Sequence, residues 1–543
     1  MSSYLLFEIF ENIFDLLKSD TGTLYSCMFV KRSWCRSIIP ILWSNSFKYV
    51  KRENSGKLIT TYLKFLSNDT DLSYLEERML LKDGKNLLSL IRGESNFIFD
   101  YPIYLKELDC SYISQIIDEW SFLMISQENI SYPHQRIFCA RWFSNKLIRL
   151  FMKKSIKIRA MILNSDEYHF NETFAFKNSE EIVGFNFLQT LHLDYCCDGH
   201  SLRDIAITCH SIEELWISLT EINADTDTLN QLILSQKGLK DFRLRSAVFV
   251  MEYFFGVSYD LLEALMMQKE KLHTVQFFCC QFFNCESLKP LSECTNLKRL
   301  GFFNCEGLFE EKIKPLASGS LKNLQVLAMA VYKGFSPKVI VNMIKNSQKN
   351  LKRISLPMAT PQNNMFKVFY DMKSYSKNLI GITVCFMAGD SKSFESFLSL
   401  LDACPNLEYL CIEGGDTEGT PLNFDDDDMI IEFKNLTKFI PRTVYRLVFY
   451  NISLSSKLLQ TFLDNCVAKI KCLGFYECPL LIDEHINIIT DYVKKSDNEL
   501  KHLIINWCYL ISNNAIDNAR KVIDDVQFSD VEPQDMEFTA WLE

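Results

Sequence analysis

The stretch LKRLGFFNCEGL, residues 297–308, places apolar residues at its first, fourth and sixth positions and a cysteine at its ninth. The same phrase returns four times, as LQTLHLDYCCDG from Leu188, LHTVQFFCCQFF from Leu272, IKCLGFYECPLL from Ile470 and LKHLIINWCYLI from Leu500. A phrase that recurs along a chain is typical of a repeat architecture, in which each unit buries its apolar edge against its neighbours. The phrase therefore organises most of this protein.

Twelve units follow this frame, most of them 24 to 30 residues apart. The fourth and sixth residues point the same way on a strand, so each unit predicts a short strand with one apolar edge. The stretches between strands, such as SPKVIVNMIKNSQKN from Ser336 and DSKSFESFLSLLDAC from Asp390, begin at an N-capping residue and have helical apolar spacing. Strand, crossover helix and parallel strand together predict an α/β solenoid. The first positions of the units are Leu188, Ile212, Leu239, Leu272, Leu297, Leu324, Leu351, Leu379, Leu407, Val444, Ile470 and Leu500.

This pattern resembles the leucine-rich repeat, and the version with cysteine at position nine is similar to its cysteine-containing subtype. The resemblance covers residues 186–530 and implies a horseshoe, with a parallel sheet on the concave face and helices on the convex face. Two units, 239–272 and 407–444, are longer than the rest. The second holds four consecutive acids, residues 425–428, which do not alternate as a calcium loop does; a solvated insertion is favoured over a cation site.

Composition and charge exclude several classes of protein. With 48% hydrophobic and 23% charged residues, the chain of 543 residues can bury a sizeable core. A net charge of −10 argues against a nucleic acid partner, because that affinity comes from clustered Lys and Arg. The first basic residue is Lys18, which is the wrong charge order for a secretory signal, and no uncharged stretch reaches the roughly 18 apolar residues that span a bilayer. We expect a protein of the cytoplasm, the nucleus or both, without a membrane anchor.

Eight of the nineteen cysteines fall at fixed positions of the repeat, five at position nine and three, Cys209, Cys294 and Cys404, three residues before a first position. No C-x-x-C pair occurs. The usual zinc-ribbon and redox patterns are therefore missing. A cysteine at position nine is interpreted as a small buried hydrophobe with a weak S–H donor, in preference to a metal ligand, and we expect no metal and no cofactor. The cysteines at that position are Cys196, Cys280, Cys305, Cys478 and Cys508.

The first 47 residues follow a different pattern. Two stretches, 5–17 and 24–34, carry apolar residues at helical spacing, and Pro40 is expected to end the second run before PILWSN adds further large apolar residues. Three short helices of this kind have more apolar surface than they can bury alone. The segment therefore predicts a partner.

This segment resembles an F-box, whose pattern runs L-P-x-E-I, I-F, V-x-K-x-W-C and a closing L-W. Leu6 stands where the pattern has its proline. The stretch TLYSCMFVKRSWCRSIIPILW is also similar to the expanded F-box families of arbuscular mycorrhizal fungi. The residues that match the pattern are Leu5, Glu8, Ile9, Ile13, Phe14, Val30, Lys31, Trp34, Leu42 and Trp43. The resemblance implies an adaptor-binding surface made of Leu5, Ile9, Ile13, Phe14, Val30, Trp34, Leu42 and Trp43.

Two segments carry weaker signals. Residues 48–185 hold helical stretches and two partial phrases, LKELDC from Leu105 and IRAMIL from Ile158, so we interpret them as a helical linker with degenerate first repeats. Residues 531–543, VEPQDMEFTAWLE, form an acidic tail. The tail is either a frayed end or a cap whose Trp541 docks on the last coil. The predicted organisation is F-box 1–47, linker 48–185, repeats 186–530 and tail 531–543.

Motifs for phosphate binding and metalloprotease chemistry, G-x-x-x-x-G-K-[ST], H-E-x-x-H and G-x-G-x-x-G, do not occur, and we expect no enzyme. The two resemblances together imply the substrate-recognition subunit of an SCF-type cullin-RING ubiquitin ligase. The F-box would hold a Skp-family adaptor, and through it a cullin and a RING subunit, while the repeats bind a protein substrate. Two alternatives stay open: a non-degradative leucine-rich-repeat scaffold without ligase association, or a hydrolase whose catalytic group the motifs do not reveal.

The substrate surface is predicted on the concave sheet, at positions three, five, seven and eight of each phrase, which point away from the core or lie beyond it. These positions mix arginine with aromatic residues, as binding hot spots do, and the arginines favour an acidic or phosphorylated substrate. The alternative is that the aromatic residues pack on neighbouring strands and the arginines are only solvated. The predicted residues are Trp216, Arg243, Arg245, Phe278, Arg299, Phe303, Arg353, Tyr409, Arg446, Tyr450, Tyr476 and Trp507.

Overall fold

The structure is a computed structural model of the whole chain. By its internal contacts the chain divides into two units, Met1–Asp241 and Phe242–Glu543, which are described one at a time. The residues that the structure describes are 9–10, 12–50, 54–67, 91, 97–124, 133–163, 185–193, 199–219, 226–246, 255–330, 336–359, 365–387, 390–415, 421–425, 427–495 and 500–529.

Unit 1 opens with short helices and continues into a small parallel sheet. Residues 12–16 are helical. The helices that follow are α2 (Thr21–Met28), α3 (Arg32–Leu42), α4 (Ser46–Tyr49), α5 (Ser55–Leu63), η2 (Lys64–Leu66), η4 (Tyr101–Tyr104), α7 (Cys110–Met124), α8 (Pro133–Lys154), α9 (Gly199–Thr208) and α10 (Thr226–Ser235). The strands are β1 (Glu107–Asp109), β2 (Ala160–Leu163), β3 (Thr190–Leu193) and β4 (Glu214–Leu219), each parallel to the next.

An N-capping residue sets the start of helix α2, and helix α3 continues through its proline. Helix α2 begins after Asp20, whose carboxylate accepts the backbone N–H of Thr23 at 3.0 Å. Helix α3 runs through Pro40 to Leu42, so the expectation that Pro40 ends this helix is wrong. Pro40 lies in the last turn, where the missing N–H removes a single hydrogen bond, and Trp43 N–H still donates to Ile39 O at 3.0 Å.

The N-terminal helices share a small core of their own. Phe14, Leu24 and Ile38 are buried at its centre. Around them pack Phe10, Leu17, Cys27, Met28, Trp34, Ile41 and Leu42. The segment after α3 joins this core to the first strand of the unit, because the N–H of Lys106 donates to Ser44 O at 2.8 Å. The two partial phrases of the linker, from Leu105 and Ile158, lead into β1 and β2.

Unit 2 is a regular succession of strands and helices, and β5 (Asp241–Ser246) lies at its boundary. Its further strands are β6 (Thr274–Phe278), β7 (Arg299–Phe303), β8 (Val326–Ala330), β9 (Arg353–Ala359), β10 (Gly381–Phe386), β11 (Tyr409–Gly414), β12 (Leu422–Asn423), β13 (Arg446–Tyr450), β14 (Ile452–Ser453), β15 (Cys472–Tyr476), β16 (His502–Asn506) and β17 (Asp525–Ser529). Its helices are α11 (Tyr259–Met266), α12 (Lys289–Ser292), α13 (Glu310–Ile313), η7 (Lys314–Ser318), α14 (Pro337–Ser347), α15 (Met365–Met372), α16 (Ser391–Leu401), α17 (Asp427–Phe439), α18 (Ser456–Asn465), α19 (Asp483–Lys495) and α20 (Asn513–Arg520).

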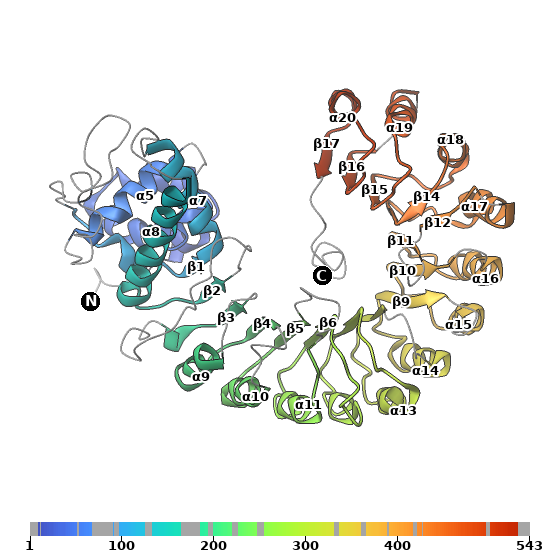
Figure 1. Cartoon of the computed structure of the whole chain (residues 1–543), viewed down its shortest axis with the longest axis horizontal. Coiled ribbons are helices and arrows are strands. Elements are labelled where there is room, and N and C mark those ends of the chain that lie inside the picture. The colour runs from blue at the N-terminus through green and yellow to red at the C-terminus, as the bar shows by residue number, and fades with distance from the viewer. Residues whose placement is uncertain are drawn as a thin grey trace. The chain divides into compact units, whose positions relative to one another are not determined.

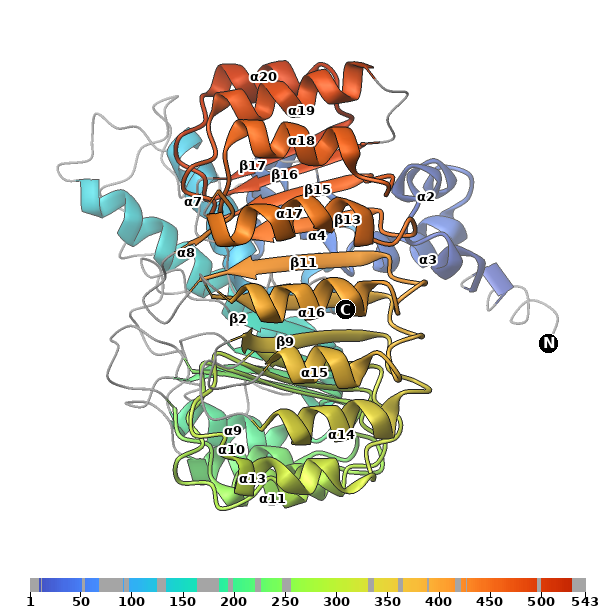
Figure 2. The ribbon, with the colours of Figure 1, turned by 90° about the vertical axis from the view of Figure 1, so that its right-hand side faces the viewer.

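The strands of unit 2 form one parallel sheet in the order β6, β7, β8, β9, β10, β11, β13, β15, β16 and β17. Within this unit they line the inner side of an arc whose outer side carries the helices (Figure 1). Figure 2 shows α14 to α20 stacked in front of the strands that they cover. The predicted α/β solenoid is confirmed. Strand β17 belongs to a further coil, in which Ile523, Val526 and Phe528 repeat the apolar frame that the sequence analysis ended one unit earlier.

Three kinds of side chain hold successive coils of unit 2 together, namely apolar residues, asparagines and cysteines. The apolar positions fill the core. Leu297, Leu300 and Phe302, for example, are each at most 1% exposed. The residue just before the first leucine is an asparagine in five coils, and its amide N–H donates to a carbonyl of the preceding coil at 2.9 to 3.1 Å. These asparagines are Asn296, Asn323, Asn350, Asn378 and Asn406.

Where a cysteine occupies position nine, its thiol forms hydrogen bonds at the end of the strand. Cys305 Sγ lies 3.4 Å from Phe277 O in the preceding strand and 3.4 Å from Phe303 O in its own. Asn304, the residue before it, has a φ of 50°, the left-handed conformation that turns the chain inward. Burial raises the pKa of the Cys280 and Cys478 thiols well above the usual value, so they stay protonated and donate. These contacts agree with the interpretation of a small buried hydrophobe with a weak donor.

The acidic insertion of unit 407–444 is partly ordered by hydrogen bonds. Strand β12 pairs with β14 in parallel. Asp425 accepts the Ser455 hydroxyl at 2.6 Å at the start of α18, so the first acid of the run supports a neighbouring helix. Asp426 and the side chains of the two acids that follow lie outside the described residues. Within the described ranges, no group of three His, Cys, Asp or Glu is placed to hold a metal, and no helix is both long and apolar enough to cross a bilayer.

Candidate binding surfaces

The first helical segment of unit 1 has two apolar faces. Phe14 on one face is only 2% exposed and belongs to the core. Ile9, Ile13 and Leu16 occupy another, and they are 49%, 43% and 82% exposed. Residues three and four apart lie on one side of a helix, so these three form a continuous stripe. The core fixes one face of the helix while the other is presented to solvent.

The residues predicted to bind an adaptor fall into four groups. Ile9, Ile13 and Val30 are exposed, Val30 by 65%. Phe14 is buried, so it supports the helices and offers no contact surface. Trp34 and Leu42 are half-buried and pack on the same core. Leu5 lies outside the described residues.

Trp43, the last of the predicted adaptor residues, joins the N-terminal helices to the rest of unit 1. Its ring stacks on Tyr101, with centroids 3.9 Å apart and planes 20° apart. It also meets Tyr62 edge-on at 5.4 Å. Trp43 is half-buried in these contacts. It therefore holds the N-terminal helices against α5 and η4.

Three further exposed apolar residues of this region were not predicted from the sequence. Leu16 extends the stripe, and Tyr25 and Phe29 lie on α2 with 59% and 69% exposure. The rings of Tyr25 and Phe29 meet edge-on at 5.1 Å. Their spacing of four residues in YSCMF was the available signal, because it places both rings on one side of a helix.

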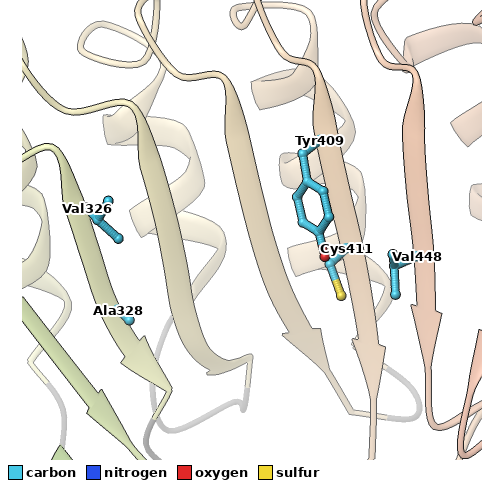
Figure 3. Packing of buried hydrophobic residues seen from close by; sticks show 5 residues of the cluster. All are labelled: Val326, Ala328, Tyr409, Cys411 and Val448. Carbon is cyan, nitrogen blue, oxygen red and sulfur yellow. The ribbon is translucent and has the colours of Figure 1, made fainter. Parts of the chain in front are cut away.

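The concave face of unit 2 is built from positions three, five and seven, which share one side of each strand. Figure 3 shows residues at positions three and five, which point away from the helices. Position three forms a column across the sheet, since each residue lies beside the next in the strand register. The column runs Arg299, Val326, Arg353, Gly381, Tyr409 and Arg446. It gathers four of the residues predicted for the substrate surface and intersperses them with smaller ones.

Position five forms a floor of small side chains beside this column. Its members are Gly301, Ala328, Ser355, Thr383, Cys411, Val448 and Gly474. Val326, Ala328, Tyr409, Cys411 and Val448 make one buried apolar cluster, with Phe303 and Tyr476 packed against it. This floor was not predicted from the sequence, although small residues recur at position five of successive units.

Two aromatic residues lie flat over glycines of the floor. A Cβ atom on Gly301 would lie 2.6 Å from Phe303 Cε2, and one on Gly474 would lie 3.2 Å from Tyr476 Cε2. Phe303 also stacks on Phe278, with centroids 4.7 Å apart and planes at 7°. The glycines therefore allow position seven to fold back over position five.

The start and the end of the strands differ in charge. Arg299, Arg353 and Arg446 lie at the start. At the end, the Tyr450 hydroxyl donates to a Glu477 carboxylate oxygen at 2.5 Å, and Glu413 lies beside Tyr450 in register. Burial first, and the charge of Glu477 second, raise the pKa of Glu413 to about 7. A ligand on this face meets cations at one side and carboxyl groups at the other.

The remaining predicted substrate residues are more dispersed. Trp216 lies in β4 and belongs to unit 1. Arg243 and Arg245 lie in β5 and are half-buried. Trp507 follows β16 with a φ of 57° and its ring lies 6.0 Å from that of Tyr509.

Phe278 and Tyr409 are exposed by only 2% and 9%, so they form walls of the concave face more than open contact points. Within unit 2, the structure brings the predicted residues together in three places. These are the position-three column of Arg299, Arg353, Tyr409 and Arg446, the stack of Phe278 on Phe303, and the neighbouring pair of Tyr450 and Tyr476.

No family model matches the chain, and no curated protein matches it. Among solved structures, the chain is similar to the Rad7 and Elc1 complex of yeast, with a TM-score of 0.39 and 13% identity over 60% of this chain and 78% of that one. It is also similar to the internalin inlF of Listeria monocytogenes, with a TM-score of 0.26 and 13% identity over 71% of this chain and 89% of the other. TM-scores this low carry no functional argument.

Proposed function

We propose that this protein is the substrate-recognition subunit of an SCF-type cullin-RING ubiquitin ligase. Its N-terminal helices bind a Skp-family adaptor, and through it a cullin and a RING subunit, and its leucine-rich repeats bind a protein substrate. The observation that carries the proposal is the first helical segment, which buries Phe14 in a core and presents Ile9, Ile13 and Leu16 to solvent.

Such a stripe suits binding for an energetic reason. Apolar surface gains roughly 25 cal/mol for each Å² that leaves water. The core already fixes the helix, so little backbone order remains to be gained on binding. The F-box-like residues Ile9, Ile13 and Val30 are among the exposed ones, which supports a Skp-family adaptor as the partner.

The repeats supply the second surface. An arginine presents a planar fork that pairs with a carboxylate or a phosphate through two hydrogen bonds. Arg299, Arg353 and Arg446 share one column beside the floor of small side chains and its buried apolar cluster, which supports an acidic or phosphorylated protein segment as the substrate. The chain's own contribution is proximity, which places a substrate lysine near a thioester carried by other subunits. We expect the protein to act in the cytoplasm, the nucleus or both. Its fungal origin is a prediction from the sequence.

Adaptor co-purification tests the proposal. The double variant Ile9→Asp/Ile13→Asp should lose a co-expressed Skp-family adaptor, because two charges enter an apolar contact, while its thermal unfolding stays close to wild type. Leu480→Asp is the matched control, since Leu480 is 55% exposed and lies in unit 2. Unchanged adaptor recovery by the double variant contradicts the proposed surface. If the wild-type chain recovers no adaptor, the leucine-rich-repeat scaffold without ligase association replaces the proposal.

A further inference from the structure

Strand β13, which lies between β11 and β15, has opposite charges at its two ends. Its residues Arg446, Val448 and Tyr450 share the concave side, because successive side chains of a strand alternate between its faces. Arg446 supplies a cation at the start of the strand. At the end, Tyr450 lies beside Glu413 in the strand register, and its hydroxyl donates to a carboxylate oxygen of Glu477 at 2.5 Å.

The cationic end is already held in a geometry suited to binding. The guanidinium carbon of Arg446 lies 5.5 Å from the centroid of the Tyr409 ring, and the ring itself is on the neighbouring strand and only 9% exposed. Arg446 Nε is buried and has no hydrogen-bond partner in the described part of the chain. A planar guanidinium in this position can direct N–H groups to a carboxylate of a ligand.

The carboxyl end lacks a compensating cation for Glu413. Burial first, and the charge of Glu477 second, raise the pKa of Glu413, and neither a cation nor a hydrogen-bond donor of the described residues lowers it. A positive group placed between the two carboxylates would relieve their repulsion. Since no three metal-ligating side chains are grouped within the described ranges, the cation that fits this end is an ammonium or a guanidinium group.

The distance between the two ends fits an extended peptide. Arg446 and Tyr450 are four residues apart on one strand, which corresponds to about 13 Å at about 3.3 Å per residue. An extended peptide has the same rise, and its residues i, i+2 and i+4 face the same way. Figure 3 shows the floor between the ends, where Cys411 and Val448 are 0% and 3% exposed. The middle residue of such a peptide would therefore meet an apolar surface.

We propose that the concave face around β13 binds an extended segment of a protein substrate that carries an acidic and a basic residue four positions apart, with an apolar residue midway. The acidic side chain pairs with Arg446, and the lysine or arginine lies between Glu413 and Glu477. The inference rests on the proposed function, because it takes the concave face as the substrate surface, and it adds a basic residue at a fixed distance to the acidic segment. The acidic tail, residues 531–543, lies outside the described residues and is no part of this site.

Selection from a random peptide library tests the pattern. Displayed peptides are selected on the immobilised full-length chain, and the recovered sequences are scored for the separation between acidic and basic residues. Wild type should enrich a separation of four residues over every other separation by about tenfold, because only this spacing brings an extended peptide into contact with both ends of β13.

Each end of the strand has its own variant. Arg446→Glu should replace the preference for an acidic residue by one for lysine or arginine, and Arg446→Gln should remove the preference without inverting it. The double variant Glu413→Gln/Glu477→Gln should lose the preference for a basic residue and keep that for an acidic one. A glutamine at position 477 still offers an oxygen to the Tyr450 hydroxyl, so this variant keeps the local hydrogen bond.

Two exposed positions provide matched controls. Arg442→Glu, just before β13, and Glu395→Gln, on α16, should select the same peptides as wild type. Thermal unfolding of every variant separates a loss of fold from a loss of binding. If Arg446→Glu does not fold, Arg446→Gln and the glutamate double variant still test the two ends one at a time.

Three results would overturn the proposal. The first is a wild-type selection that enriches no peptide, or acidic peptides in which a basic residue is absent or has no fixed separation. The second is recovery of the same peptides by wild type and the Arg446 variants, and the third is a preference for lysine or arginine that survives in the double variant. The selection contains no adaptor, so its failure is distinguishable from a failure of the proposed function, which is measured by adaptor recovery.

Discussion

Arg446 lies against the ring of Tyr409 on the neighbouring strand, with the guanidinium carbon 5.5 Å from the ring centroid. Tyr409 is 9% exposed, and burial raises its pKa well above the usual value, so the ring stays neutral and fixed. A guanidinium that lies over an aromatic face keeps its N–H groups directed outward in its own plane. Arg446 is therefore held ready for a carboxylate or a phosphate before any ligand arrives.

This arrangement predicts a specific loss of binding. Arg446→Glu should weaken binding of acidic and phosphoserine peptides from a synthetic array by about tenfold or more, because a charge-assisted hydrogen bond contributes about 1.5–3 kcal/mol. Tyr409→Phe should bind within about twofold of wild type, since the ring remains. Arg442→Glu, at an exposed position just before the strand, is the control for net charge. Equal losses for Arg442→Glu and Arg446→Glu would argue against a localised site.

The contact of Phe303 with Gly301 predicts the cost of one methyl group. Gly301→Ala should lower the urea midpoint of unit 2 by the equivalent of about 1–3 kcal/mol, because the new Cβ would lie 2.6 Å from the Phe303 ring. Gly256→Ala is the matched control, since a Cβ there meets nothing within 4 Å and its expected effect is neutral or slightly stabilising. If the two variants unfold at the same urea concentration, the ring of Phe303 does not depend on the glycine.

The asparagines that link successive coils predict a sensitivity to their amide group. Asn350 donates its amide N–H to Lys322 O at 2.9 Å. Asn350→Asp keeps the shape but turns the donor into a second acceptor, so it should cost about 0.5–1.5 kcal/mol in urea unfolding at pH 7, the net contribution of a hydrogen bond at an exposed position. Asn284→Asp, at an exposed position of another coil, should change stability by less than about 0.5 kcal/mol. Similar stabilities for both variants would show that the asparagines contribute little.

The pKa of Glu413 predicts a pH dependence of stability. Because burial and Glu477 raise it from 4.5 to about 7, the folded chain keeps a proton that the unfolded chain releases between these values. The contribution of Glu413 is therefore greatest below pH 4.5 and is lost as the pH rises through 7, by up to about 3 kcal/mol. Glu413→Gln should flatten the stability profile of unit 2 over this interval, whereas Glu395→Gln on the exposed side of α16 should not. Parallel profiles for wild type and Glu413→Gln would refute the raised pKa.

The sequence by itself determined the coil of this protein. Each of the twelve phrases from Leu188 to Leu500 leads into a strand, because a buried leucine and a period of two are local properties that a short stretch carries alone. Asp390 caps its helix as expected, by accepting the N–H of Ser393 at 3.2 Å. The effect of Pro40 was predicted wrongly for the opposite reason, since the effect of a proline depends on its place in the helix and on the packing around it.

Only the tertiary structure decided which side chains of the concave face meet. Arg446 lies beside Tyr409, and Arg299 and Arg353 on either side of Val326, because backbone hydrogen bonds set the register between strands that are 25 or more residues apart in the sequence. The exposure of individual residues could not be predicted from the sequence either. Phe14 and Ile13 are apolar neighbours in the chain, but Phe14 is buried and Ile13 is exposed. The burial of a side chain depends on which residues pack against it in the folded protein. A sequence pattern reports only which residues are its neighbours along the chain.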